Sequence, residues 1–358
     1  MLHSKTVYLF AALLFTAAAM GTQPQIISEK LLNYNHLKTA WVNNLVLAKG
    51  ETAEKLFVMD KDIYVLTSHN TLFCLNRSNG TMRFVINAAS KGLPVFEPKL
   101  YEDKLFLIAA NYLLIIDNEL GVQIYKQRIK FSVTASATPN ASYLYIAGMD
   151  RRLHAMDRSA KFENFAVAAD NDPIVTSIVA TNDYVAFATD KGNIIRISPE
   201  KPEKVWQYDT VGEISAPLVL DGQWLYAAGR DTNLYKLDME TGKLAWQMRT
   251  QATLSTEPRV TGTAVYQYAP NKGLYAVNVE DGRIMWLLEN GVELLAEDGE
   301  KAYVMTNDRL CSVMDNKAGK KLYSINFSEV SRFASNTLDS AMYLLDNNGQ
   351  IVCVEPVK

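Results

Sequence analysis

The chain has 358 residues, of which 48% are hydrophobic and 21% are charged, and its formal net charge is −3. These proportions are typical of a folded globular protein and indicate neither a basic nucleic-acid surface nor a polyacidic tail. Length alone would allow two domains, so the organisation has to come from the pattern along the chain.

The first 21 residues have the pattern of a signal peptide. Residues 1–5 carry a small positive charge, residues 6–20 form an apolar run, and residues 17–21 offer small side chains for cleavage. The run is shorter than the roughly 20 residues of a membrane-spanning helix. We therefore predict an exported protein with no transmembrane span in the mature chain; an uncleaved anchor is the alternative. Residues 22–40 are polar and are expected to be irregular.

Residues 234–246 read as a strand, a tight turn and a second strand. The inner strand ends at Asp238, a Glu-Thr-Gly turn reverses the chain, and the outer strand carries Trp246. The same pattern returns 40 residues later and ends at Trp286. A period of this length predicts a repeat architecture.

Two series of residues keep this period along the chain. The last apolar residue of the inner strand recurs every 37–41 residues, at Leu75, Ile116, Met156, Ile197, Leu237, Val277, Met314 and Val354. The aromatic residue of the outer strand keeps step with it, at Phe84, Tyr125, Phe165, Trp206, Trp246, Trp286 and Tyr323. We expect these rings to be structural, because one large ring per repeat fills the widening gap between neighbouring sheets.

Trp41 supplies the missing eighth aromatic. The chain ends before an aromatic can follow Val354, and Trp41 stands 43 residues before Phe84 without an inner strand of its own. We predict that Trp41 lies on the outer strand of the eighth blade, because a shared blade leaves no open edge in the ring. The predicted fold is all-β: an eight-bladed β-propeller with four-stranded antiparallel blades over residues 41–358, closed by the N-terminal strand joining the C-terminal blade.

The sequence offers no constellation for chemistry. The four histidines have no metal-ligand spacing, and His69 and His154 are expected to be solvated or satisfied by neighbours. No nucleophile elbow, phosphate loop or dinucleotide fingerprint occurs. Cys74, Cys311 and Cys353 are expected to be small buried thiols, without a disulfide. We therefore predict no catalytic, cofactor-binding or metal-binding residue.

Basic residues recur in the turns between the second and third strands of successive repeats. Equivalent turns of a propeller converge on one rim around the channel, so these residues would form a basic collar: Arg151, Arg152, Lys191, Arg230, Lys272 and Arg309. A collar of this kind would attract an anion or an acidic partner, and salt would weaken the attraction. The alternative is a set of solvated turn residues that bind nothing.

The pattern L-Y-x-L-D-x-x-T-G-K-x-x-W of residues 234–246 resembles the repeat of pyrroloquinoline-quinone (PQQ)-type propellers. Within that superfamily, eight blades in so short a chain behind a signal segment resemble the BamB family of the outer-membrane β-barrel assembly machinery. Residues 298–310 and 342–352 are similar to the corresponding BamB segments. The Leu-Arg element that carries partner contacts in that family has no counterpart between Trp206 and Glu213, so no contact residue is assigned from the resemblance.

The resemblance implies a non-enzymatic protein-interaction scaffold in the periplasm or at the outer membrane. Its partners would be barrel-assembly components, it would need no cofactor, and we expect a monomer that binds no nucleic acid. Two alternatives stay open: an envelope propeller that binds sugars or peptides, and a PQQ-dependent dehydrogenase. Dehydrogenases with this repeat commonly carry a disulfide of adjacent cysteines and calcium ligands, and this chain has no adjacent cysteine pair.

Overall fold

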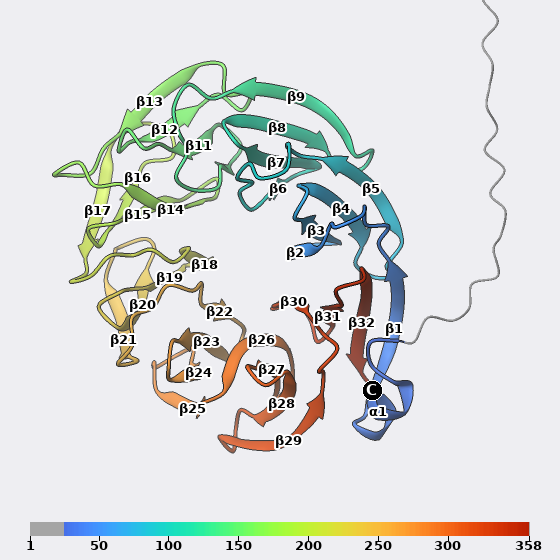
Figure 1. Cartoon of the computed structure of the whole chain (residues 1–358). Coiled ribbons are helices and arrows are strands. Elements are labelled where there is room, and N and C mark those ends of the chain that lie inside the picture. Colours follow the sequence, from blue (N-terminus) through green and yellow to red (C-terminus); the bar gives the residue numbers. More distant parts are fainter. Residues whose placement is uncertain (1–24, 358) are drawn as a thin grey trace, which may run out of the picture.

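The computed structural model describes residues 25–357, which form eight four-stranded antiparallel sheets arranged as the blades of a ring (Figure 1). This confirms the predicted eight-bladed β-propeller. The predicted signal peptide, residues 1–21, lies outside the described residues. Within residues 25–357, no helix is long and apolar enough to cross a membrane.

Each blade runs from a first strand at the channel to a fourth strand at the periphery. Blades 1 and 2 are β2 (Ala53–Met59), β3 (Asp62–Thr67), β4 (Thr71–Asn76), β5 (Met82–Asn87), and β6 (Lys99–Tyr101), β7 (Lys104–Ala109), β8 (Tyr112–Asp117), β9 (Val122–Arg128). Blades 3 and 4 are β10 (Thr138–Pro139), β11 (Leu144–Ala147), β12 (Leu153–Met156), β13 (Glu163–Val167), and β14 (Val175–Ala180), β15 (Val185–Thr189), β16 (Asn193–Ile197), β17 (Lys204–Asp209).

The other four blades repeat this order. Blades 5 and 6 are β18 (Val219–Asp221), β19 (Trp224–Ala228), β20 (Asn233–Asp238), β21 (Leu244–Arg249), and β22 (Arg259–Val260), β23 (Ala264–Ala269), β24 (Gly273–Asn278), β25 (Ile284–Leu288). Blade 7 is β26 (Gly291–Asp298), β27 (Lys301–Thr306), β28 (Leu310–Asp315) and β29 (Lys320–Asn326). Blade 8 combines β30 (Arg332–Ala334), β31 (Met342–Leu345) and β32 (Gln350–Pro356) with β1 (Leu37–Asn44).

Burial changes along the radius of each blade. All six residues of β3 and all four of β31 are buried, because the middle strands are covered on both faces by the neighbouring blades. The outer strands alternate instead, as in β21, where Trp246 and Met248 are buried between exposed neighbours. The inner strand of the sequence repeat is the third strand of the blade, and the channel is lined by the first.

The ring is closed by both ends of the chain. β1 pairs antiparallel with β32, which places Trp41 opposite Cys353 on the outer strand of blade 8, as predicted (Figure 1). The preceding segment is more regular than expected: residues 22–40 include the helix α1 (Glu29–Tyr34) and the start of β1. The hydroxyl of Ser28 accepts the Leu31 backbone N–H at the first turn.

The helix α1 fills the space beside the closing blade. Leu32 and Leu37 are fully buried in a cluster that also contains Leu295 and Phe327 of blade 7 and Val354 of blade 8. The segment therefore covers the junction between blades 7 and 8. A helix of six residues shows too little of the 3.6-residue period to be recognised from sequence.

The outer aromatic residues contact the neighbouring blade. The indole N–H of Trp246 donates to the Val279 carbonyl of blade 6 at 3.1 Å, and that of Trp41 donates to the Arg77 carbonyl of blade 1 at 3.0 Å. Gly282 has a φ of +73° in the turn beneath Trp246, and an ideal Cβ there would lie 2.8 Å from the indole. These rings therefore link one blade to the next.

The three cysteines are free and buried. Cys74 and Cys353 lie on third strands of adjacent blades, β4 and β32, and burial raises the pKa of each thiol to about 12. They are small core residues, in agreement with the sequence prediction.

Candidate functional site

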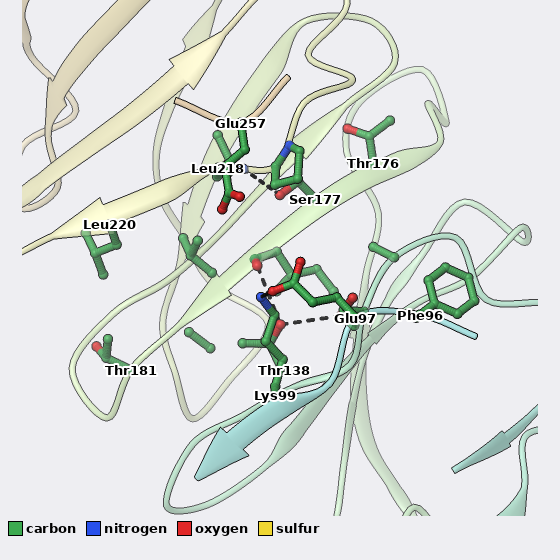
Figure 2. A pocket seen from close by; sticks show the side chains of 16 residues that line it. Phe96, Glu97, Lys99, Thr138, Thr176, Ser177, Thr181, Leu218, Leu220 and Glu257 are labelled. Atoms are coloured by element: carbon green, nitrogen blue, oxygen red, sulfur yellow. Dashed lines mark hydrogen bonds and ion pairs between the residues drawn. The ribbon is translucent and has the colours of Figure 1, made fainter. Parts of the chain in front are cut away.

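Two regions of the ring could contact another molecule: the central channel, and the face that carries the turns between second and third strands. The channel contains two connected hollows of about 400 and 520 Å³. Glu97, Lys99 and Glu257 line both hollows, although they come from blades 2 and 6 on opposite sides of the ring (Figures 1 and 2). Thr138, Ser177 and Thr181 add hydroxyl groups to the first hollow.

The charged groups of the channel form an ion-pair network. The ammonium of Lys99 lies 2.7 Å from a Glu97 carboxylate oxygen, as Figure 2 shows. Across the channel, the guanidinium of Arg259 pairs with Glu257 and, at 3.1 Å, with Glu293 of blade 7. Lys99 therefore pairs with one carboxylate and Arg259 with two, and these five groups of the network carry a formal charge of −1.

Burial and like charge change the acidity of Glu257. Burial in the channel raises the pKa of this carboxyl, the charge of Glu97 adds to the increase, and the neighbouring Arg259 opposes it. Burial acts to lower the pKa of Arg259, but the carboxylates of Glu293 and Glu257 outweigh it and raise that pKa. Arg259 therefore stays charged and holds the two glutamates in place.

This network was not predicted from the sequence. Its signal is the pattern Glu-Pro-cation, which occurs as Glu97-Pro98-Lys99 and again as Glu257-Pro258-Arg259. Proline suits the start of a strand, and residues two apart point to the same side of it. The pattern therefore aims a carboxylate and a cation together into the channel.

The channel residues do not fit a PQQ site. Calcium in proteins takes about six to eight oxygen ligands, whereas Glu97, Glu257 and Glu293 already pair with Lys99 and Arg259. Among residues 25–357, no group of three or more His, Cys, Asp or Glu is placed to hold a metal ion. The channel can instead offer hydroxyls and a slight negative charge to a polar ligand.

The predicted collar residues lie in the turns expected for them. Because all blades share one strand order, the turns between second and third strands lie on one face, beside the connections that lead from blade to blade. Arg151, Arg152, Lys191, Arg230 and Arg309 are exposed, and Lys272 is half-buried. Backbone hydrogen bonds fix the turns to the connections, for example Arg230 N–H to the Glu213 carbonyl at 2.9 Å.

Acidic residues occupy the same turns, but their carboxylates are used within the protein. Asp190 accepts the Ile174 backbone N–H at 2.9 Å, and Asp231 accepts the Tyr235 hydroxyl. Asp150 lies 3.0 Å from His154 Nε2. Of the collar cations, Arg230 has a carboxylate nearby, with Glu213 at 3.7 Å. The aspartates therefore keep their charge beside the cations, but in the described chain they form no ion pair with the collar cations.

His154 on β12 is satisfied by neighbours, as expected. Its Nδ1 lies 2.5 Å from Glu163, its Nε2 faces Asp150, and its ring stacks on Phe131 at 4.0 Å between centroids. Both ring nitrogens are engaged and the side chain is 6% exposed. This histidine anchors the turn that carries Arg151 and Arg152, and it has no free nitrogen for catalysis.

The fold is that of an eight-bladed β-propeller, and its repeat is similar to that of PQQ-type propellers. A family model described as outer membrane protein assembly factor BamB matches residues 190–355, a little less than half of the chain. Comparison with curated proteins gave no match.

Two solved structures show the same fold. The crystal structure of BamB from Moraxella catarrhalis has a TM-score of 0.68 and 14% sequence identity, over 89% of this chain and 97% of that one. The computationally designed protein Ika8 has a TM-score of 0.68 and 12% identity, over 88% of this chain and 99% of that one. At these identities the likeness shows the fold alone. The chain is an eight-bladed propeller that resembles the PQQ-type propellers and BamB, as its repeat predicted.

Proposed function

We propose that the chain is a non-enzymatic protein-interaction scaffold of the cell envelope, exported and periplasmic or associated with the outer membrane, where it assists outer-membrane protein assembly. The observation that carries the proposal is the collar: exposed cations on rigid turns of one face, with the aspartates of those turns bonded to neighbouring groups. The family match over residues 190–355 and the BamB-like fold support the same reading.

The collar suits an acidic protein partner. The chain is acidic overall, with a net charge of −3, so a cluster of exposed cations on one face is a local feature. Such a surface speeds the encounter with a negatively charged partner and sets its orientation, and added salt weakens both effects.

Affinity capture from envelope extract tests the proposal. We expect the wild-type chain to retain a barrel-assembly component, identified by mass spectrometry, and the triple variant R151E/R152E/R230E to lose most of it. The matched control K243E/R283E/K301E reverses three exposed cations on the opposite face and should capture normally. Capture that is unchanged by the collar variant, or lost equally in both variants, would remove the collar from the proposal.

The channel supports a second candidate, the binding of a sugar or a peptide. The observation that favours this candidate is the hydroxyl-lined hollow of about 400 Å³ beside Glu97 and Lys99. Enrichment of one glycan or peptide on a ligand array, lost in the variant T138V/S177A, would favour this candidate.

The dehydrogenase alternative predicts that PQQ with calcium raises the melting temperature, because a bound ligand stabilises the folded state. The scaffold proposal predicts no shift in the melting temperature.

A further inference from the structure

The connection from blade 2 to blade 3 differs in charge from the other seven connections between blades. It covers residues 129–137, between β9 and β10, and its Lys130 follows Arg128, the last residue of β9. Each of the other connections contains at least one acidic residue, whereas residues 129–137 contain none. The face that carries the collar therefore has one purely basic connection as well as its basic turns.

A hollow of about 590 Å³ lies at this connection. It lies between the connection and the turn that joins β7 to β8, and the side chains that line it include Asn111, Gln127, Arg128, Lys130, Phe131 and Ser132. The Ile129 N–H donates to the Asn111 carbonyl at 2.8 Å, so a backbone hydrogen bond joins the two sides of the hollow. Its volume is within the range of roughly 300–1,000 Å³ that is usual for small-ligand pockets.

The cations of the hollow have no acidic partner in the protein. Arg128 and Lys130 are exposed, and among residues 25–357 neither forms an ion pair with a carboxylate. The turn of residues 149–152, which carries two exposed collar arginines, adjoins the hollow, because its Met149 N–H donates to the Ser132 carbonyl at 2.8 Å. The positive charge around the hollow is therefore available to an anion from solution.

Phe131 gives the hollow an apolar surface whose position is fixed. The ring is half-buried, and the imidazole of His154 stacks on it with 4.0 Å between the centroids. The carboxylates of Asp150 and Glu163 lie 3.0 and 2.5 Å from the two nitrogens of His154 and hold the imidazole in place. An ideal Cβ at Gly148 would lie 2.9 Å from the Phe131 ring, so the ring also packs closely on the backbone of the adjoining turn.

We propose that this hollow is a binding site for a phosphorylated sugar. The planar guanidinium of Arg128 can donate to two phosphate oxygens at once, and the ammonium of Lys130 adds a second positive charge. The negative face of the Phe131 ring attracts positively polarised C–H groups such as those of a sugar ring. The side chains of Asn111 and Ser132 can donate to and accept from the sugar hydroxyls. The inference goes beyond the proposed function, because it assigns a small ligand to a site that no protein partner is needed to form.

Isothermal titration calorimetry of the full chain with glucose 6-phosphate tests the proposal. We expect saturable binding to one site, with an affinity that falls by about tenfold or more in R128Q/K130Q. The control K320Q/K321Q removes the same charge from two exposed lysines of the outer strand β29 and should alter the affinity by less than about twofold. Absence of binding to the wild type, or equal losses in the two variants, would overturn the proposal. Neither pair belongs to the collar, so the result is independent of capture by R151E/R152E/R230E.

Inorganic phosphate and the variant Phe131→Leu test the contribution of the sugar ring. The wild type should bind glucose 6-phosphate about fivefold or more tightly than inorganic phosphate, because the ring of Phe131 contacts the sugar. In Phe131→Leu this preference should disappear while inorganic phosphate still binds. Equal affinities of the wild type for the two ligands would contradict a sugar site.

Vesicles distinguish a soluble sugar phosphate from a lipid headgroup of the same chemistry. Phosphatidylcholine vesicles that contain phosphatidylinositol 4-phosphate present a phosphorylated ring at a membrane surface. Binding of these vesicles that is tighter than binding of glucose 6-phosphate, and that is lost in R128Q/K130Q, would assign the ligand to a lipid headgroup; weaker binding would assign it to a soluble sugar phosphate. Equal binding of phosphatidylglycerol vesicles would show attraction by charge alone and would contradict the site.

Discussion

Gly282 and Trp246 show how single residues join one blade to the next. The turn of blade 6 takes a positive φ at Gly282, and the indole of blade 5 lies against it where a side chain would stand. The same arrangement recurs at Gly242 beneath Trp206 and at Gly80 beneath Trp41. These glycines therefore have no Cβ atom where the indole of the neighbouring blade packs.

We predict that Gly282→Ala destabilises the protein more than Gly299→Ala. Both glycines have positive φ, +73° and +58°, so both substitutions cost about 1–2 kcal/mol of backbone strain. No atom lies within 4 Å of the added Cβ at Gly299, whereas the Trp246 ring blocks it at Gly282. The extra cost at Gly282 should be about 1–3 kcal/mol. Urea unfolding measures the difference, and equal losses would show that the indole can move aside.

The channel gives a second prediction at the residue scale. Because the Glu257 pKa is raised in the folded state, the folded protein binds more protons than the unfolded chain between the ordinary carboxyl pKa and the raised value. Stability from this group is therefore gained as pH falls through that window and lost as pH rises. When the pH is lowered from neutral to mildly acidic, the wild type should gain stability relative to Glu257→Gln. Denaturation curves that shift in parallel, or in the opposite direction, would contradict this.

At the scale of the element, the repeating unit is the hairpin of the third and fourth strands. In blade 5, the Thr241 backbone N–H and hydroxyl donate to Asp238 Oδ1 at 2.7 and 2.8 Å, and Gly242 N–H donates to the Asp238 carbonyl. In blade 6, Asn278 Oδ1 accepts the equivalent Asp281 N–H at 3.2 Å and also the Glu280 N–H at 2.8 Å. Either side chain can therefore hold the turn, which explains why the repeat varies at this position without losing its geometry.

Substitutions at Asp238 should follow this equivalence. Asp238→Asn keeps the acceptor and should change the free energy of unfolding by less than about 0.5 kcal/mol at neutral pH, whereas Asp238→Ala should cost about 1 kcal/mol. The Thr241 hydroxyl and the backbone N–H groups lower the Asp238 pKa, so the contribution of its charge is lost as pH falls below the usual carboxyl range. Asp238→Asn should therefore be less sensitive to acid. Chemical unfolding at neutral and acidic pH tests both points. Equal losses of unfolding free energy in the two variants would show that the Asp238 side-chain oxygen does not hold the turn.

Elements were predictable from sequence where the repeat specifies them. The outer aromatics and turn glycines revealed the hairpins, and the spacing of Trp41 from Phe84 revealed the eighth blade. The helix α1 was missed because it is a single short element outside the period. The channel network was missed because Glu97 and Arg259 are far apart in sequence, and closure of the ring brings them to one cavity. The collar turns were predicted, but the hydrogen-bond partners of their aspartates depend on the three-dimensional arrangement of the blades.

At the scale of the whole molecule, closure of the ring fixes the geometry of the collar. The collar turns lie on one face because every blade has the same strand order. If the eighth blade were incomplete, its third strand β32 would be left with an unpaired edge. The pairing of β1 with β32 is thus the feature on which the account depends.

An engineered disulfide between β1 and β32 tests this pairing most directly. Lys38 is exposed and Glu355 is half-buried. They are register partners whose charged groups lie 3.8 Å apart, so the variant K38C/E355C places two cysteines directly opposite each other. The native thiols are buried and should not compete. The control K38C/V357C moves one cysteine two residues along the strand, to a distance that a disulfide does not span without backbone movement. The account predicts an intramolecular 38–355 disulfide in a monomer, found by peptide mapping, with a raised melting temperature and little cross-linking in the control; free thiols, or disulfides between molecules, would contradict the closed ring.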